Sequence, residues 1–254
     1  MTRRVTSIAL TLALTLALAA CSGDSPSPSQ NERQSPSPSP YVISPSPSPS
    51  PDPSPAAQIG DIITFGAYEW RVLDVQNGKA LIITDKIIDF RSYHSEWEDI
   101  TWADCDLRAY LNGEFYNSFS AADRARIVET RNVNKDNQWF GTSGGADTTD
   151  KIFLLSLEEA VKYFGDSGQL ANGNPNSDWY IDDQYNSARI ARTAKAVPES
   201  DYPPGSAWTW WLRSPGYHSS GATFAHRDGE LDVEGNPVHN DVLGVRPAMW
   251  LDLG

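Results

Sequence analysis

Apolar and polar positions alternate between residues 208 and 213, where three tryptophans and a leucine fall within five positions. Trp208, Trp210 and Leu212 occupy one set of alternating positions, and Trp211 makes the other set partly apolar. A period of two predicts a β-strand. Because both faces carry apolar side chains, we expect this strand inside a sheet, with material on each side, and ended by the following Pro-Gly pair.

Other runs predict further elements of both kinds. Strands are expected in 60–74, 80–84, 151–156, 222–227, 231–233 and 244–251, with turns at Asn77-Gly78 and Asp228-Gly229. Helices are expected over 104–117, 120–128 and 157–164. Ser120 and Ser156 are the expected N-caps, and Glu159 completes a capping box with Ser156. The mixture of strands and helices predicts an α+β domain over residues 58–254.

Residues 1–20 have the three parts of a secretory signal peptide: two arginines, an apolar run and small residues before a cleavage point. The sequence Leu18-Ala19-Ala20-Cys21 resembles the lipobox of bacterial lipoproteins. That resemblance implies that Cys21 carries a diacylglyceryl group and that the preceding residues are removed. The alternatives are an ordinary signal peptide or a transmembrane anchor, but an apolar run this short and interrupted by threonines is a poor membrane span.

Ser-Pro repeats dominate residues 21–57, which we interpret as a disordered linker. Alternating proline excludes both helix and sheet, so the segment is expected to be an extended spacer with a rise of about 3.1 Å per residue. At that rise it would reach on the order of 100 Å. The linker is therefore expected to act as a stalk between the lipid anchor and the folded domain.

Net charge excludes two classes of partner. The 254-residue chain has a formal charge of −13 and an isoelectric point near 4.6. Nucleic acid is not expected as a partner, since affinity for polyphosphate comes mainly from Lys and Arg. Anionic lipid would also repel this surface, so the predicted contact with the membrane is through the lipid on Cys21 alone.

Seven short motifs follow one another along the domain: FGAY at 65–68, WRVLD at 70–74, TW at 101–102, LR with LN at 107–112, DKIFLLS at 150–156, WLRSPG at 211–216 and GVRPA at 244–248. Together they resemble an uncharacterised bacterial domain family of secreted and lipid-anchored proteins, whose pattern is similar to the C-type-lectin-like fold. The resemblance implies a mixed or antiparallel sheet with flanking helices and long loops. It also implies that the first and last strands pair and that loops present a variable ligand surface.

The sequence departs from true C-type lectins in two ways. Cys105 has no partner for a disulfide if Cys21 is acylated, and we expect it to be a buried, inert thiol. The calcium-binding lectin motifs Glu-Pro-Asn and Trp-Asn-Asp do not occur. The oxygen-bearing series Asn172, Asn174, Asn176 and Asp178 leaves calcium open, although its single carboxylate and the intervening proline favour an Asn-rich turn. No metal or other cofactor is otherwise expected.

A catalytic alternative rests on residues 141–145, Gly-Thr-Ser-Gly-Gly, which match the G-x-S-x-G pattern of serine hydrolases. In such enzymes the serine, here Ser143, stands on a sharp turn between a core strand and a helix. The flanking residues here are polar and predict no helix, so a flexible glycine loop is the favoured interpretation. We therefore expect no catalysis, with a cell-envelope hydrolase as the alternative.

Polar and aromatic residues gather in the C-terminal portion, where C-type-lectin-like proteins display their ligand contacts. Such residues are typical of binding surfaces, although each could also be an ordinary solvated hairpin residue. The predicted ligand-binding residues are Tyr217, His218, His226, Asp228, His239 and Asn240. The spacing of the histidines does not match a zinc site.

Tryptophans and arginines outside this portion are assigned mainly structural roles. Trp97, Trp139 and Trp179 lie in polar contexts, where a ring either stacks on a ligand or holds a loop to the domain. The motif arginines are expected to pair with nearby carboxylates, because a buried guanidinium needs one. These arginines are Arg71, Arg108, Arg213 and Arg246, and the expected partners are Glu69, Asp74 and Asp150.

Together these features predict a lipid-anchored lipoprotein on the extracytoplasmic face of a bacterial cell membrane. Its stalk would display one monomeric domain that binds an extracellular ligand, either a glycan or a protein. The two alternatives are a cell-envelope hydrolase that uses Ser143 and a structural envelope protein without a diffusible ligand.

Overall fold

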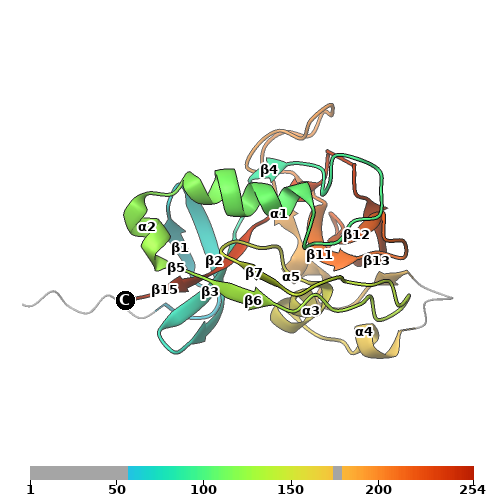
Figure 1. Cartoon of the computed structure of the whole chain (residues 1–254), viewed down its shortest axis with the longest axis horizontal. Helices are drawn as coiled ribbons and strands as arrows, with labels where there is room; N and C mark the ends of the chain where they lie inside the picture. Colours follow the sequence, from blue (N-terminus) through green and yellow to red (C-terminus); the bar gives the residue numbers. More distant parts are fainter. Residues whose placement is uncertain (1–56, 174–178) are drawn as a thin grey trace, which may run out of the picture. The chain divides into compact units, whose positions relative to one another are not determined.

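Two β-sheets with flanking helices form the part of the chain that the structure, a computed structural model, describes: residues 57–173 and 179–254 (Figure 1). The first sheet is antiparallel throughout. In spatial order its strands are β1 (Ile62–Phe65), β2 (Tyr68–Gln76), β3 (Lys79–Thr84), β15 (Ala248–Asp252) and β5 (Ile127–Val128).

The second sheet is mixed, because β11 and β14 run parallel while the other neighbours are antiparallel. Its strands in spatial order are β4 (Asp89–Phe90), β14 (Gly244–Val245), β11 (Trp210–Pro215), β12 (Gly221–Ala225), β13 (Leu231–Pro237) and β8 (Tyr180–Ile181). Two short pairs complete the strands: β6 (Thr130–Asn132) with β7 (Thr148–Asp150), and β9 (Ala191–Arg192) with β10 (Ala207–Trp208).

The helices are short, and the first three α-helices begin at a side-chain cap. They are α1 (Asp106–Tyr110), continued by the π-helical turn η1 (Leu111–Phe115), then α2 (Ala121–Arg126), α3 (Leu157–Phe164), α4 (Gln169–Asn172) and α5 (Asn186–Arg189). Ser120 caps α2, and Ser156 forms the predicted capping box with Glu159 on α3. Within the described residues, none of these helices has the length and apolarity needed to cross a membrane.

The fold confirms the α+β class and the position of the tryptophan-rich strand. β11 lies inside the six-stranded sheet, and Trp210, Trp211 and Leu212 are fully buried. The turn at Asn77-Gly78 is also confirmed, since both residues have positive φ, 51° and 73°, as the tight hairpin between β2 and β3 requires.

Three expectations differ from the structure: one strand, the end of one helix and the pairing of the first and last strands. Residues 151–156 form only a single bridge, Phe153 with Ala248, because the preceding backbone N–H groups of Lys151 and Ile152 donate to the Asn112 side chain instead of to a strand. The helix after Ser120 ends at Arg126, where the chain turns into β5 to pair with β15. The first and last strands share a sheet without pairing, because β2 and β3 lie between them.

The arginine partners are only partly those expected. Arg108 pairs with Asp150, as predicted. Arg71 binds Asp85 rather than Glu69 or Asp74, because Asp85 directly follows β3, the strand that pairs with β2.

The other two motif arginines have different surroundings. Arg213 pairs with Glu159, the capping-box residue of α3, so this carboxylate serves both the helix and the β11 strand. Arg246 is buried without an ion pair among the described residues, which contradicts the expectation of a carboxylate partner.

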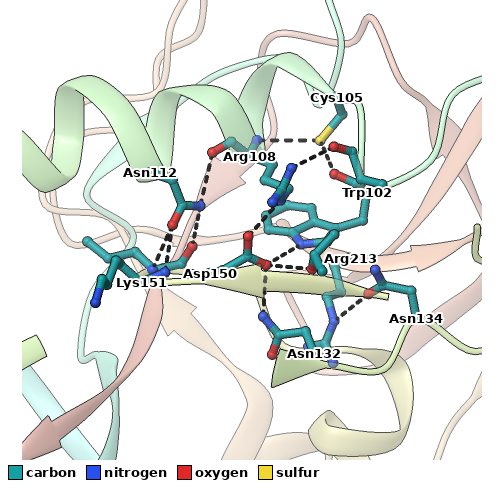
Figure 2. Close-up of polar contacts among 12 residues, drawn as sticks. Trp102, Cys105, Arg108, Asn112, Asn132, Asn134, Asp150, Lys151 and Arg213 are labelled. Carbon is teal, nitrogen blue, oxygen red and sulfur yellow. Dashed lines mark hydrogen bonds and ion pairs between the residues drawn. The ribbon is translucent and has the colours of Figure 1, made fainter. Parts of the chain in front are cut away.

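The buried carboxylate of Asp150 joins four segments of the chain (Figure 2). One oxygen accepts a hydrogen bond from Arg108 Nε at 2.6 Å. The other accepts from Trp102 Nε1 at 3.0 Å, Asn132 Nδ2 at 2.8 Å and Thr148 Oγ1 at 2.7 Å. The Asp150 side chain is 0% exposed, so these bonds replace the water that its charge loses on burial.

Asn112 extends this network one turn along the helix. Its Nδ2 donates to the carbonyls of Arg108 and Ile152, and its Oδ1 accepts from Lys151 N at 2.7 Å (Figure 2). Cys105 stands at the other end, where its buried sulfur accepts from Arg108 N as the cap of α1. Burial raises the pKa of this thiol to about 12, which agrees with the expectation of an inert cysteine.

We expect Asp150→Ala to lower the free energy of unfolding by roughly 3–5 kcal/mol, because the substitution removes the charge partner of Arg108 and leaves three buried donors without an acceptor. Urea unfolding at neutral pH measures this loss. The control is Asp147→Ala, which removes the exposed partner of Arg131 and should cost about 1 kcal/mol or less. Equal losses in the two variants would contradict the central role of Asp150.

Candidate ligand-binding groove

A groove with a volume of about 400 Å³ crosses one face of the six-stranded sheet. The strand register places its main side chains together: Phe224 on β12 lies opposite Asp232 on β13, and Asp232 lies opposite Tyr180 on β8. Residues directly opposite on antiparallel strands point to the same face. The side chains of Trp208 and Asn236 add to the lining. Aromatic rings and polar groups thus share one hollow of the surface.

The turn between β12 and β13 forms one end of the groove. His226 N donates to Glu230 O at 2.8 Å, and Gly229 N donates to His226 O at 2.9 Å. Gly229 has a φ of 94°, and a Cβ there would overlap the carbonyl of Asn186. Glycine is therefore required at this position, and the close contact with α5 fixes where His226 and Glu230 stand.

Burial and neighbouring carboxylates perturb the acids in this groove. Asp232 is only 5% exposed, and its pKa is raised to about 6, mainly by burial and further by the charge of Glu234, against the hydrogen bond that it accepts from Gly235 N. Burial and the charge of Asp228 raise the pKa of Glu230. The charge of Asp232 in turn raises the pKa of Tyr180. A perturbed carboxylate in a hollow is a common feature of functional sites.

Three of the six predicted ligand-binding residues belong to this groove or its rim. His226 lines it, and His226 Nδ1 lies 2.9 Å from Asp228 Oδ1. Asn240 Nδ2 donates to Asn236 Oδ1 at 2.9 Å at the other end. Partial burial of the Asp228 carboxyl opposes its ionisation, but the hydrogen bond with His226 outweighs this and lowers the pKa of Asp228.

The other three lie beyond the far end of the β12–β13 hairpin, where Gly221 pairs with Pro237. The ring of Tyr217 packs against His218 and, at 4.8 Å between centroids, against Phe140. His239 packs against Trp97 at 5.8 Å. These side chains are exposed but are not among the residues that line the groove.

With this geometry established, comparison with known proteins gives one match. The family model described as Domain of unknown function (DUF6273) matches residues 77–253. The chain belongs to this family. Neither curated proteins nor solved structures gave any match. The DUF6273 match contains β3 to β15, and therefore both the groove and the Asp150 network.

Several groove residues of this DUF6273 domain were not predicted as ligand contacts: Tyr180, Trp208, Asp232 and Asn236. Trp208 was assigned to the core strand, but it is only half-buried, at the end of β10. The one available signal is Asp232, a carboxylate between the apolar residues Leu231 and Val233 of the expected strand. Tyr180 reaches the groove through the pairing of β8 with β13, and no short stretch of the sequence indicates which strands will pair.

Ser143, the nucleophile of the catalytic alternative, lies outside the groove. Ser143 is exposed in the loop between β6 and β7, and its Oγ accepts a hydrogen bond from Gly145 N at 3.2 Å. The segment that follows it is β7 rather than the helix that a nucleophile elbow needs.

The calcium series lies only partly within the described residues. Asn172 ends α4, with Nδ2 donating to Gly168 O, while Asn174, Asn176 and Asp178 fall outside them. Elsewhere, His226, Asp228 and Glu230 offer ligand atoms within 4.8 Å of one another.

The loop tryptophans divide between the two roles considered for them. Trp139 holds its loop to the domain, since its Nε1 donates to Leu170 O at 2.9 Å. Trp97 is 72% exposed and Trp179 is 47% exposed, so both present ring surface to solvent.

We expect Asp232→Asn to raise stability at neutral pH. The folded pKa near 6 lies above the ordinary value of 3.8, so ionisation opposes folding: the penalty is absent below about pH 4 and grows as pH rises through about 6. The variant should gain about 2–3 kcal/mol in unfolding free energy at pH 7.5 and less than about 1 kcal/mol near pH 4. Denaturant unfolding at the two pH values measures this difference. A gain that is equal at both would show that the charge is not responsible.

Proposed function

We propose that this DUF6273 domain binds an extracellular ligand, and that the groove on its six-stranded sheet takes a neutral glycan. The observation that carries the proposal is that Tyr180, Trp208 and Asp232 line the same groove. An exposed ring next to a carboxylate offers both contacts that a sugar needs, an apolar face for its C–H groups and an acceptor for its hydroxyls.

The polar lining favours uncharged ligands. Glu230 and Asp232 contribute carboxyl groups, His226 an imidazole and Asn236 an amide, so the groove has several acceptors and no permanent positive charge. An acidic saccharide would be repelled by these carboxylates. Tyr180, 42% exposed, can stack on a sugar ring without rearrangement.

The rest of the chain supports display outside the cell. The lipobox-like sequence that ends at Cys21 and the Ser-Pro segment after it suit a lipid-anchored lipoprotein whose stalk presents a monomeric domain on the extracytoplasmic face of the membrane. Within this proposal the domain has a C-type-lectin-like fold. Its mixed sheet, flanking helices and long connections support that relationship, as does the position of the groove beside the C-terminal hairpin. The proposal needs no catalytic group.

Glycan binding is tested with an array of glycans and peptidoglycan fragments. We expect saturable binding to uncharged saccharides, weakened roughly two- to tenfold by Tyr180→Ala or His226→Ala, since a contact of an aromatic ring is worth roughly 0.5–1.5 kcal/mol. Trp97→Ala is the matched control, because it removes another exposed ring outside the groove.

The Trp97→Ala control and the presence or absence of calcium in the buffer distinguish a site elsewhere on the domain from a calcium-dependent site. Loss of binding in Trp97→Ala but not in Tyr180→Ala would move the site to the cluster of Trp97 and His239. Dependence on calcium, measured against a chelator, would assign a role to the Asn172–Asp178 series or to the His226 turn. Silence of the whole array would overturn the glycan proposal and favour a protein ligand.

Lipid anchoring is tested with Cys21→Ser. We expect the unmodified chain to partition into the detergent phase of a Triton X-114 extraction and the variant to partition into the aqueous phase, because the acylated thiol is the proposed attachment point. Identical partitioning of the two chains would contradict an anchor at Cys21. Ser22→Ala, next to the cysteine, serves as the control and should keep the detergent partition.

A further inference from the structure

A second cavity, of about 520 Å³, shares no lining residue with the groove. Its walls come from β2, the residues after β3, the end of α3, α5 and β9. Ligand pockets in proteins commonly have volumes of roughly 300–1,000 Å³, so this cavity is large enough for a small molecule.

The charge of this cavity is opposite to that of the protein. Four cationic side chains line it, from Arg71, Lys86, Arg192 and Arg246, against the single carboxylate of Asp85. The whole chain has a formal charge of −13. Because acidic residues dominate the chain, a local surplus of positive charge inside a hollow marks a place where an anion would be concentrated.

Arg246 is the unusual member of this set. It is 2% exposed, its Nε donates to Thr84 O at 2.8 Å, and its Nη1 has no hydrogen-bond partner. Within the described residues, no carboxylate forms an ion pair with it. Burial lowers the pKa of Arg246 to about 10; the charge of Asp85 opposes this shift, and the charge of Arg71 adds to it. A buried guanidinium without a directly paired carboxylate is costly, and an anion from solution would lower that cost.

The carboxylate in the cavity is already engaged. Asp85 Oδ1 lies 2.8 Å from Arg71 Nη2. Arg192 also lacks a carboxylate partner, since its Nη1 donates to the backbone carbonyl of Gly205. Arg192 and Arg246 therefore keep positive charge that no described side chain neutralises through an ion pair.

We propose that this cavity binds a small molecule that carries an oxyanion, either a carboxylate or a phosphate group. Arg246 and Arg192 bind the oxyanion, because guanidinium groups match the planar and forked geometry of these anions. Apolar side chains of Phe164, Val72 and Ile190 line the same cavity and accept the uncharged body of the ligand. This site is independent of the glycan groove.

The test uses thermal unfolding of the full-length chain with two probes, inorganic phosphate and benzoate, each against chloride at equal ionic strength. We expect a saturable rise in Tm with at least one probe, about 3 °C at ten times its Kd. Saturation by phosphate alone would assign the site to phosphorylated molecules, and saturation by benzoate alone to carboxylates.

The variants locate the effect. Arg246→Met should abolish the anion-dependent rise, and Arg192→Gln should weaken the apparent Kd at least tenfold. Arg192 is exposed and forms no ion pair among the described residues, so that variant keeps the test valid if Arg246→Met does not fold. Lys79→Gln removes an exposed cation outside the cavity and should leave the rise unchanged. Equal effects of chloride and both probes, or a full response in Arg192→Gln, would overturn the proposal.

Discussion

The buried carboxylate of Asp150 is the interaction on which much of the domain depends. Its four donors come from the segment before α1, from α1 itself, from β6 and from β7. A carboxylate at 0% exposure has lost its water, so it needs these donors to stabilise its charge. The buried donors in turn need the carboxylate, because without it they would have no hydrogen-bond acceptor. This mutual dependence holds a short helix and a two-stranded ribbon in one arrangement that apolar packing alone would specify less sharply.

Asp232 is a contrasting case in the same domain. The charge of Asp150 is balanced by an arginine and three neutral donors, whereas Asp232 has a raised pKa and accepts from backbone N–H groups such as that of Gly235, with no cationic partner among the described residues. Asp150 therefore contributes to stability, and the ionised form of Asp232 opposes it. Proteins retain costly groups of the second kind mainly at sites that act on other molecules. Among the groove residues, Asp232 is the one whose presence packing does not explain.

Local signals in the sequence predicted the local features well. Ser156 with Glu159, the Asn77-Gly78 turn and the apolar strand around Trp210 each depend on residues within a few positions of one another. The strand expected over 151–156 failed because a single distant side chain, Asn112, took its backbone donors. The β-propensity of residues 151–156 carries no information about Asn112, whose side chain lies 39 positions from Lys151 in the sequence and accepts its hydrogen bond.

The candidate site was predicted only in part, for the same reason. His226 and Asp228 form one turn, so sequence proximity brought them together, while Tyr180 reaches the groove only through the pairing of β8 with β13. Arg246 was expected to have a carboxylate because buried arginines usually do. Its actual surroundings depend on Asp85 being bound to Arg71, a choice between partners that the sequence does not reveal.

The place of β15 has a consequence for the order in which the domain forms. This strand lies between β3 and β5, so the five-stranded sheet stays split until residues 248–252 have been synthesised. Before that moment β3 has an unpaired edge, and Ile82 and Ile83 lack the neighbour that covers them. Pairings between segments this far apart form slowly, because the intervening chain must first be closed into a loop. The five-stranded sheet is therefore completed only once residues 248–252 are available, and until then the exposed edge of β3 is open to pairing with another chain.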